Sequence, residues 1–264
     1  MNFIDAILLG ILQGATEFLP VSSSGHLVLA QYLLDDFRQP GVLFDVLLHV
    51  GTMVAVVLYF RRDLLDLFSS LWRRDAAAER ERSTLVMLLV ASIPTAVIGL
   101  SFKDFFEGLF ERPDLVCLML LVTGSLLWLA QKLRDQQTPR TRLTILDALI
   151  VGTAQGAAII PGISRAGATI ASLLLRGIDG ETAARFSFLL ALPAVFGAAL
   201  ISLKDLEAVA TADILPYLAG TTASMIAGLL CIHLLLLVLR NQRLHWFAIY
   251  CWAVGLAGSL YFWL

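Results

Sequence analysis

Pro20-Val-Ser-Ser-Ser-Gly-His26 and Pro161-Gly-Ile-Ser-Arg-Ala-Gly167 each interrupt a long hydrophobic segment, residues 3–34 and 145–175 respectively. Unsatisfied backbone groups in lipid cost several kcal/mol each, so such breaks persist only where protein buries them or where they line a wet cavity. Neither segment is therefore expected to form one continuous helix. We predict that each is a re-entrant hairpin, in which a helix, a loop and a second helix return the chain to the side it entered from.

The rest of the chain consists mainly of apolar runs of membrane-crossing length. Of its 264 residues, 58% are hydrophobic and 15% are charged, against about 25% charged in an average soluble domain. No polar stretch is long enough for a soluble domain, and the N-terminus lacks the features of a removable signal peptide. We predict a single all-α polytopic membrane domain, 1–264, with six transmembrane helices. The expected spans are Val42–Phe60, Leu85–Phe102, Leu115–Ala130, Ala183–Leu203, Ile214–Leu239 and Trp246–Leu264.

The sequence repeats itself at an offset of 142 residues. The shared polar and glycine positions indicate a duplication into halves 1–142 and 143–264. Each half would hold one hairpin and three crossings. Since three is odd, the second half would be inverted relative to the first, as in many transporters. The aligned pairs are Asp5/Asp147, Ala6/Ala148, Gly10/Gly152, Gln13/Gln155 and Gly14/Gly156.

Basic residues cluster in two connections, 61–82 and 132–142, which the positive-inside rule assigns to the cytoplasm. We therefore expect both termini to be periplasmic, the first hairpin to enter from outside and the second from the cytoplasm. The stretch Arg73–Arg82 interleaves acids and lacks aromatics, so we interpret it as a solvated cytoplasmic loop. No nucleic-acid partner is expected, and the sequence gives no oligomeric state.

Polar and ionisable residues concentrate at the two breaks. A charged side chain at the bilayer centre costs roughly 3 kcal/mol, so Glu17 and Arg165 are functional candidates by default. Inversion would bring the two tips together, and these two residues would then share one pocket. The residues at the breaks are Gln13, Glu17, Ser22, Ser23, Ser24 and His26 in the first, and Gln155, Ser164, Arg165 and Thr169 in the second.

The residue types at the tips favour a phosphate ligand and a cation. Gln13 and Glu17 are four residues apart, so they share a helix face and together offer oxygen ligands to a divalent cation. The segments 22–25 and 162–164 each precede a helix, whose amide groups and positive dipole end would face the tip. Arg165 offers the planar fork that suits bidentate phosphate binding.

Ser23 and His26 are three residues apart, which outlines a nucleophile and a base. The alternative is structural: Ser22 and Ser24 fit the role of helix caps, and His26 could satisfy its own hairpin. Asp45 and His49 also share a helix face, and there we favour a structural pairing over a proton relay.

These motifs resemble a known family. Gln13-Gly-Ala-Thr-Glu17-Phe-Leu-Pro-Val-Ser-Ser-Ser-Gly-His26 resembles the first signature of the undecaprenyl-diphosphatase family, the bacitracin-resistance phosphatases, and Pro161–Thr169 resembles the second. Ala184–Leu190 and Ile93–Pro94 are also similar to the family. The resemblance implies an enzyme of the bacterial cytoplasmic membrane that hydrolyses undecaprenyl diphosphate to undecaprenyl phosphate and inorganic phosphate. Such an enzyme recycles the lipid carrier of peptidoglycan synthesis and confers bacitracin resistance, with a site that opens outward and needs Mg²⁺ or Ca²⁺.

The resemblance also implies roles for individual residues. It assigns the metal to Gln13 and Glu17, the nucleophile to Ser23, a catalytic histidine to His26 and phosphate binding to Arg165. Many members have Glu where this chain has Gln13, so Glu17 must do more here. The further phosphate-binding candidates are Ser22, Ser24, Gly25, Gly162, Ser164 and Thr169.

Two alternatives stay open. Metal-bound water, rather than Ser23, could attack the phosphorus directly. A membrane carrier or flippase for a lipid phosphate or another anion would use the same inverted repeat and broken helices, because fold does not fix function. Phosphate release from detergent-solubilised protein separates an enzyme from a carrier.

Overall fold

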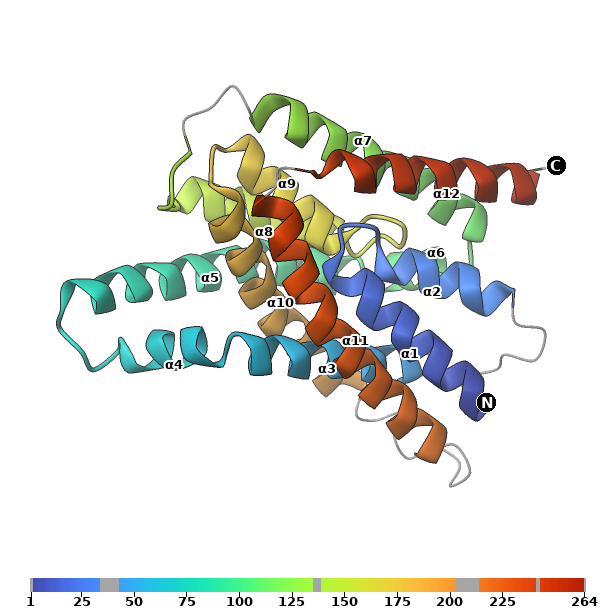
Figure 1. The fold of residues 1–264 in the computed structure, drawn as a ribbon, viewed down its shortest axis with the longest axis horizontal. Coiled ribbons are helices and arrows are strands. Elements are labelled where there is room, and N and C mark those ends of the chain that lie inside the picture. The colour runs from blue at the N-terminus through green and yellow to red at the C-terminus, as the bar shows by residue number, and fades with distance from the viewer. Residues whose placement is uncertain (1, 34–42, 135–138, 203–213, 241–242, 264) are drawn as a thin grey trace.

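The computed structural model describes residues 2–33, 43–134, 139–202, 214–240 and 243–263. Within these ranges the chain is helical apart from turns, extended connections and one isolated bridge between Arg140 and Ile178. The all-α prediction is confirmed, and Figure 1 shows the helices gathered into one bundle. In chain order the helices are α1 Phe3–Phe18, α2 Ser23–Tyr32, α3 Leu43–Tyr59, α4 Arg61–Ser69, α5 Ala76–Ser101, α6 Lys103–Leu109, α7 Pro113–Arg134, α8 Ile145–Ala157, α9 Arg165–Leu175, α10 Gly180–Ser202, α11 Ile214–Arg240 and α12 His245–Trp263.

Five helices are long and apolar enough to cross a membrane: α5, α7, α10, α11 and α12. They correspond to five of the six expected spans, although Phe102, the expected end of one span, caps α5 just beyond its last residue. The sixth corresponds to α3, which reaches membrane-crossing length only together with α4. The chain bends by 70° between those two helices. Three of the expected spans have one terminal residue outside the described residues. These are Val42, the first residue of its span, and Leu203 and Leu264, the last residues of theirs.

The interpretation of Arg73–Arg82 as a loop is wrong for most of its length, because α5 begins at Ala76. Asp75 caps this helix by accepting a hydrogen bond from the Ala78 amide. That bond and a second one from Arg73 lower the pKa of the Asp75 carboxyl. Alanine, glutamate and arginine are strong helix formers, which explains why the charged stretch continues the apolar helix rather than ending it.

Both predicted hairpins are broken where the sequence indicates. The first consists of α1, a break at 19–22 and α2, and the second of α8, a break at 158–164 and α9. Residue 34, the predicted end of the first hairpin, is not among the described residues. The side from which each hairpin enters the membrane stays a prediction.

The main helix contacts run between the two predicted halves of the chain. α1 packs chiefly against α11, α8 against α5, and α12 against α7. Two aligned glycines permit the first two contacts: a Cβ on Gly10 would lie 2.2 Å from the Gly220 carbonyl oxygen, and one on Gly152 would lie 2.0 Å from that of Ala91. Small residues at helix crossings allow backbones to approach this closely.

Gly152→Ala is therefore expected to destabilise the protein by about 1–3 kcal/mol, the usual cost of overpacking. The new methyl group would force α8 away from α5. The midpoint of thermal unfolding in detergent measures the effect. Gly197→Ala on α10 is the matched control, since a Cβ there meets nothing within 4 Å. Equal midpoints for the two variants would contradict the close helix contact.

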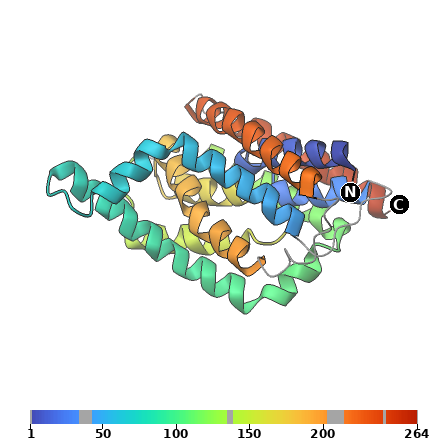
Figure 2. The same cartoon turned by 90° about the horizontal axis from the view of Figure 1, so that it is seen from below.

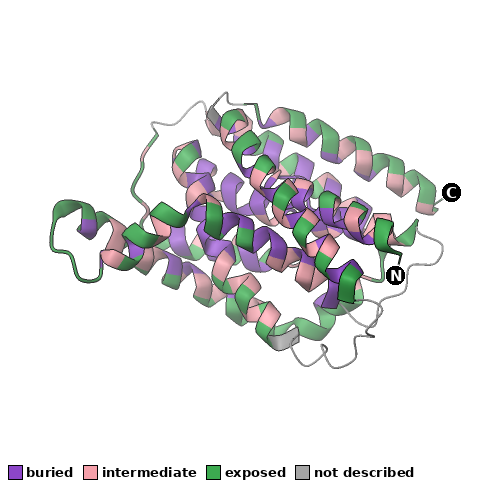
Figure 3. Cartoon of the chain, turned by 60° about the horizontal axis from the view of Figure 1, so that its bottom comes forward, coloured by how far each residue is buried: buried purple, intermediate pink, exposed green. Residues whose placement is uncertain are grey.

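The outer surface of the bundle is strongly apolar. Leu100, Leu230 and Tyr261 are 68%, 70% and 65% exposed, and Figure 3 shows buried residues at the centre with exposed ones around them. An apolar exterior of this extent is suited to lipid rather than to water. The α4–α5 connection projects from one end of the bundle in Figures 1 and 2, and both termini lie at the other end.

Candidate active site

The tips of the two hairpins touch each other inside the bundle. A Cβ on Gly25 would lie 3.0 Å from the Cα of Gly162, and one on Gly167 would lie 3.4 Å from the Cβ of Pro20. A side chain on Gly25 would crowd Gly162 of the other tip, whereas one on Gly167 would crowd Ser164 of its own hairpin. The expected meeting of the two breaks is thus confirmed at the level of backbone contact.

A strained turn precedes α2. Ser22 has φ +71°, and it is the one non-glycine residue with positive φ in the described part of the chain. Such a conformation costs on the order of 1–3 kcal/mol and persists only where the surroundings impose it. The Ser22 hydroxyl accepts a hydrogen bond from the Gly25 amide at 3.3 Å and caps the helix. The turn places Ser23 as the first residue of α2, directly at the tip.

The second break is fixed by α7. Gly162 has φ +94°, and a Cβ there would lie 2.4 Å from the carbonyl oxygen of Val116. The Thr123 hydroxyl donates to the Gly162 carbonyl at 2.9 Å and accepts from the Ser164 amide at 3.0 Å. Ser164 in turn caps α9 by accepting from the Gly167 amide at 3.0 Å. Arg165 therefore begins α9 at a fixed place beside the first tip.

Glu17 is the residue on which the site converges. It lies at the end of α1 and is 5% exposed. Its Oε1 accepts a hydrogen bond from Arg165. Its Oε2 accepts from the Ser23 hydroxyl at 2.5 Å and from the Gln13 amide nitrogen at 3.0 Å. The structure thus brings three other predicted site residues, Gln13, Ser23 and Arg165, onto the carboxylate of Glu17.

Two buried polar atoms of this cluster have no hydrogen-bond partner: Nη1 of Arg165 and Oε1 of Gln13. Buried polar groups are almost always paired, so an unpaired donor and an unpaired acceptor in one site indicate a missing ligand. The donor suits an anionic oxygen and the acceptor suits a cation.

His26 does not have the contact expected for a base acting on Ser23. Its Nδ1 lies 2.7 Å from the Ser22 carbonyl oxygen and its Nε2 lies 2.8 Å from the hydroxyl of Tyr250. Ser23 donates to Glu17 instead. The spacing of three residues places both side chains on one face of α2. The imidazole of His26, however, points back toward the Ser22 carbonyl oxygen.

His49 is a site residue that sequence reasoning missed. Its Nδ1 lies 2.8 Å from the Asp45 carbonyl oxygen, and its Nε2 lies 3.5 Å from Oε2 of Glu17. The Asp45 carboxylate accepts from Gln31 on α2 at 2.6 Å. His49 thus pairs with the backbone oxygen of Asp45, and its imidazole also faces the Glu17 carboxylate.

Three other candidates lie outside this cluster. The Thr169 hydroxyl is fully buried and lies 2.5 Å from that of Ser187 on α10. Gln155 donates to Thr95 and to the Leu190 carbonyl at 3.3 Å, so it joins α8 to its neighbours. Ser24 lies 3.4 Å from the Ser22 hydroxyl.

Asp147 closes the base of the second hairpin, at the end opposite the tip. This fully buried carboxylate accepts from Arg140 and from Arg176, each at 2.8 Å, and from the Thr144 amide in a capping box. Asp147 lies in the first turn of α8, where a carboxylate complements the positive end of the helix dipole. Since Arg176 follows α9, Asp147 ties the two helices of the hairpin together.

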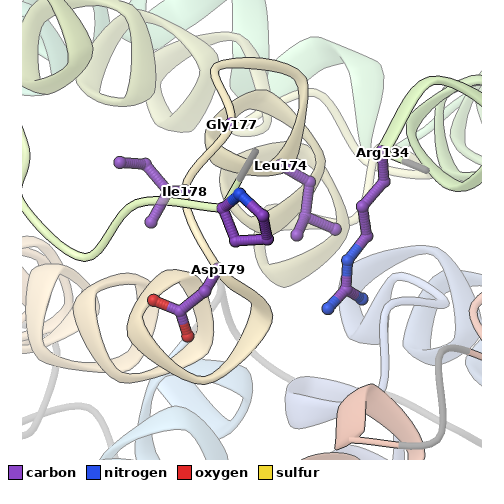
Figure 4. Close-up of a pocket in the computed structure, with 6 residues that line it drawn as sticks. Arg134, Leu174, Gly177, Ile178 and Asp179 are labelled. Carbon is purple, nitrogen blue, oxygen red and sulfur yellow. The ribbon is translucent and has the colours of Figure 1, made fainter. Parts of the chain in front are cut away.

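A small pocket near this base is too small to be the active site. Its volume is about 10 Å³, roughly that of one water position. Figure 4 shows Arg134 and Asp179 on its wall together with Leu174, Gly177 and Ile178.

The tips offer few ligands to a divalent cation. No group of three or more His, Cys, Asp or Glu side chains with metal-binding geometry occurs among the described residues. Magnesium, however, is commonly held by one or two carboxylates together with substrate phosphates and water. Glu17 and the unpaired oxygen of Gln13 fit such a partial set.

An all-helical bundle whose two helix breaks join a hydroxyl, a carboxylate and an arginine defines an integral membrane protein with a phosphate-type site. Residues 6–257 match the family model described as Bacitracin resistance protein BacA. The chain belongs to this family, which confirms the resemblance of the two signatures.

Curated relatives agree over the full length. An undecaprenyl-diphosphatase of Syntrophotalea carbinolica is 56% identical over 255 residues, covering 97% of this chain and 97% of that protein. The undecaprenyl-diphosphatases of Carboxydothermus hydrogenoformans and Halothermothrix orenii are 42% and 44% identical, each over 97% of this chain. They are covered over 95% and 96% of their own lengths.

Proposed function

We propose that this chain is a membrane phosphatase that hydrolyses undecaprenyl diphosphate to undecaprenyl phosphate and inorganic phosphate. The observation that supports this most directly is the hydrogen bond from Ser23 to Glu17, with Arg165 on the same carboxylate. In this set Ser23 is the nucleophile, Glu17 is the base and Arg165 binds phosphate. The family and the names of the curated relatives agree with it. By this activity the protein returns the lipid carrier to peptidoglycan synthesis and confers bacitracin resistance.

In the first step the Ser23 oxygen attacks the terminal phosphorus, and its proton moves to Glu17. The bond from phosphorus to the bridging oxygen breaks, and the prenyl phosphate leaves. Nη1 of Arg165 binds a phosphate oxygen, while the amide groups at the starts of α2 and α9 offer further positive charge. In the second step water attacks the phosphoserine, and the bond from phosphorus to the Ser23 oxygen breaks. Glu17 returns its proton to the Ser23 oxygen. The water oxygen keeps one proton in its new bond to phosphorus and passes the other to a phosphate oxygen, so that inorganic phosphate leaves. Phosphoryl transfer depends mainly on such positioning and charge neutralisation.

A divalent cation, Mg²⁺ or Ca²⁺, is proposed to be held by Glu17 and Gln13. When bound, it would neutralise negative charge on the diphosphate. Chelation with EDTA is expected to lower turnover at least about tenfold, and added Mg²⁺ or Ca²⁺ to restore it.

Gln13→Leu is expected to raise the cation concentration that gives half-maximal activity. Gln155→Leu, the aligned position in α8, is the matched control and should leave that concentration unchanged. Direct binding of Mn²⁺, followed by its paramagnetic signal, gives a second measurement. Full activity in EDTA, or equal cation dependence of the two variants, would contradict the assignment.

An apolar groove of about 740 Å³ between α3 and α10 is suited to the prenyl chain. It starts close to the site, since Met53 in its wall lies one helical turn after His49. Helices α3 and α10 form both walls, with no hairpin helix among them. The lining includes Val50, Met53 and Val54 of α3, and Val195, Phe196 and Ala199 of α10.

We further propose that the protein lies in the bacterial cytoplasmic membrane, with both termini periplasmic and the site opening outward. The basic α4–α5 connection and the two termini lie at opposite ends of the bundle in Figure 1, which supports this orientation.

Release of inorganic phosphate by purified, detergent-solubilised protein tests the function. Farnesyl and undecaprenyl diphosphate, with added Mg²⁺ or Ca²⁺, should both be hydrolysed. A carrier or flippase has no activity without a bilayer, so the absence of release from both substrates would reject the phosphatase and favour the carrier.

A further inference from the structure

The imidazole of His26 connects the last helix of the chain to the turn before Ser23. Its ring stacks on that of Tyr250 in α12, with centroids 5.6 Å apart and an angle of 10° between the planes. Its Nε2 lies 2.8 Å from the Tyr250 hydroxyl, and its Nδ1 lies 2.7 Å from the Ser22 carbonyl oxygen. Both ring nitrogens of this buried side chain are therefore in use.

The partners fix which nitrogen carries the proton. A carbonyl oxygen can only accept, so Nδ1 of His26 donates to Ser22. In the neutral ring Nε2 is then an acceptor, and the Tyr250 hydroxyl must donate to it. The result is a directional chain of hydrogen bonds, from the Tyr250 hydroxyl through His26 to the Ser22 carbonyl.

This chain ends on the strained residue of the site. Ser22 has φ +71°, a conformation that the surrounding contacts must impose. Its carbonyl oxygen accepts from both the His26 amide, at 3.1 Å, and Nδ1 of His26. The Ser22 carbonyl is thus held by two bonds from one residue, and the next residue is Ser23.

We propose that Tyr250 is a positioning residue of the phosphatase site, which acts through His26 to hold the Ser22 turn and so to aim the Ser23 hydroxyl at Glu17. The inference rests on the proposed phosphatase function. It gives α12, which contributes none of the residues around Glu17, a defined part in the reaction. It also assigns to His26 the orientation of the nucleophile, while Glu17 accepts the proton.

Tyr250→Phe tests the hydroxyl, because the phenyl ring keeps the stacking and removes only the donor. We expect kcat to fall about ten- to a hundredfold, as for a small misplacement of a reacting group, with KM within about twofold. Tyr261→Phe on the same helix is the matched control and should have the activity of the unmodified protein. Full activity of Tyr250→Phe would overturn the proposal.

A double-mutant cycle with His26→Ala tests whether Tyr250 acts through His26. The two substitutions should be strongly non-additive, so that Tyr250→Phe has little further effect once the imidazole is gone. Additive losses would overturn the proposed route.

The shape of the pH profile of kcat separates positioning from proton transfer. Tyr250 is the titratable group in contact with His26. The thiol of the next residue, Cys251, lies 3.8 Å from the Pro20 carbonyl oxygen, and Glu17 and Arg165 pair with each other across the tips. The profile of Tyr250→Phe should keep its shape and fall uniformly. A shift of its acidic limb would mean that His26 itself exchanges a proton in the rate-limiting step, and would overturn the positioning role.

A measurement without substrate keeps this inference separate from the proposed function. The ¹⁵N chemical shifts of the His26 ring should show a protonated Nδ1 in the unmodified protein, and the Nε2 signal should move in Tyr250→Phe. An unchanged Nε2 signal would refute the hydrogen bond even if the protein hydrolyses prenyl diphosphates normally. Absence of phosphate release by the unmodified protein would instead refute the phosphatase function.

Discussion

Ser23→Ala is expected to lower kcat for prenyl diphosphates by at least about a thousandfold, because it removes the nucleophile while keeping the helix start. The Ser23 hydroxyl is the one that donates to Glu17, at 2.5 Å. The adjacent Ser24 has its hydroxyl 3.4 Å from that of Ser22, so Ser24→Ala serves as a control and should keep turnover within about threefold. Phosphate release measures both effects.

Acid quenching of the enzyme with substrate labelled in the terminal phosphate should trap a phosphoserine at position 23. The labelled enzyme should form and decay at rates compatible with turnover. Near-normal turnover of Ser23→Ala would instead show that water attacks the phosphorus directly, in which case Ser23 only orders the carboxylate.

Glu17→Gln is expected to cause a loss of similar size, about a thousandfold or more in kcat. The amide keeps the shape of the side chain but cannot accept the Ser23 proton. It also leaves Arg165 without its counterion in a buried site, and removing one partner of a buried ion pair costs about 3–5 kcal/mol of stability. A lower midpoint of thermal unfolding should therefore accompany the loss of turnover.

Asp5→Asn is the matched control for Glu17→Gln, because it makes the same change of charge in the first turn of the same helix. Its turnover should lie within about twofold of the unmodified protein. If Glu17→Gln kept most of its activity while its stability fell, Glu17 would be a structural counterion for Arg165 and another base would have to act on Ser23.

Much of the site could be predicted from the sequence because its main signals are energetic. Proline, glycine and serine inside membrane-length apolar runs indicated helix breaks, and the structure has breaks at both places. The cost of burying Glu17 and Arg165 in a membrane indicated that each needs a partner, and they form an ion pair. Such constraints hold whatever the neighbouring helices do.

The partners of the histidines could not be predicted in the same way. His26 was matched with Ser23 by spacing along α2, yet the orientation of its ring depends on Tyr250, 224 residues away. His49 was interpreted as part of a structural pairing with Asp45, but its Nε2 lies beside Glu17 because α3 packs against α1. Tyr250 itself lies in an apolar helix in which aromatic residues are common, so nothing in its local sequence distinguished it.

The bend after α3 and the length of α5 were missed for a related reason. Hydropathy marks the limits of the apolar runs, at Phe60 and at Leu85. It does not show whether the helix bends or continues beyond those residues. The chain bends by 70° after α3, and α5 extends outward from Leu85 to Ala76 because helix-forming residues and the Asp75 cap continue it.

The packing of α1 on α11 and of α8 on α5 also bears on how the protein is made. As the chain leaves the ribosome, α8 finds α5 already synthesised. The glycine face of α1 can pack only after residues 214–240 have been synthesised, when most of the chain is complete. Glu17 therefore spends most of synthesis on a helix without its main neighbour, and Tyr250 is added later still. A chain truncated before α11 would therefore lack the helix against which α1 and its Glu17 pack.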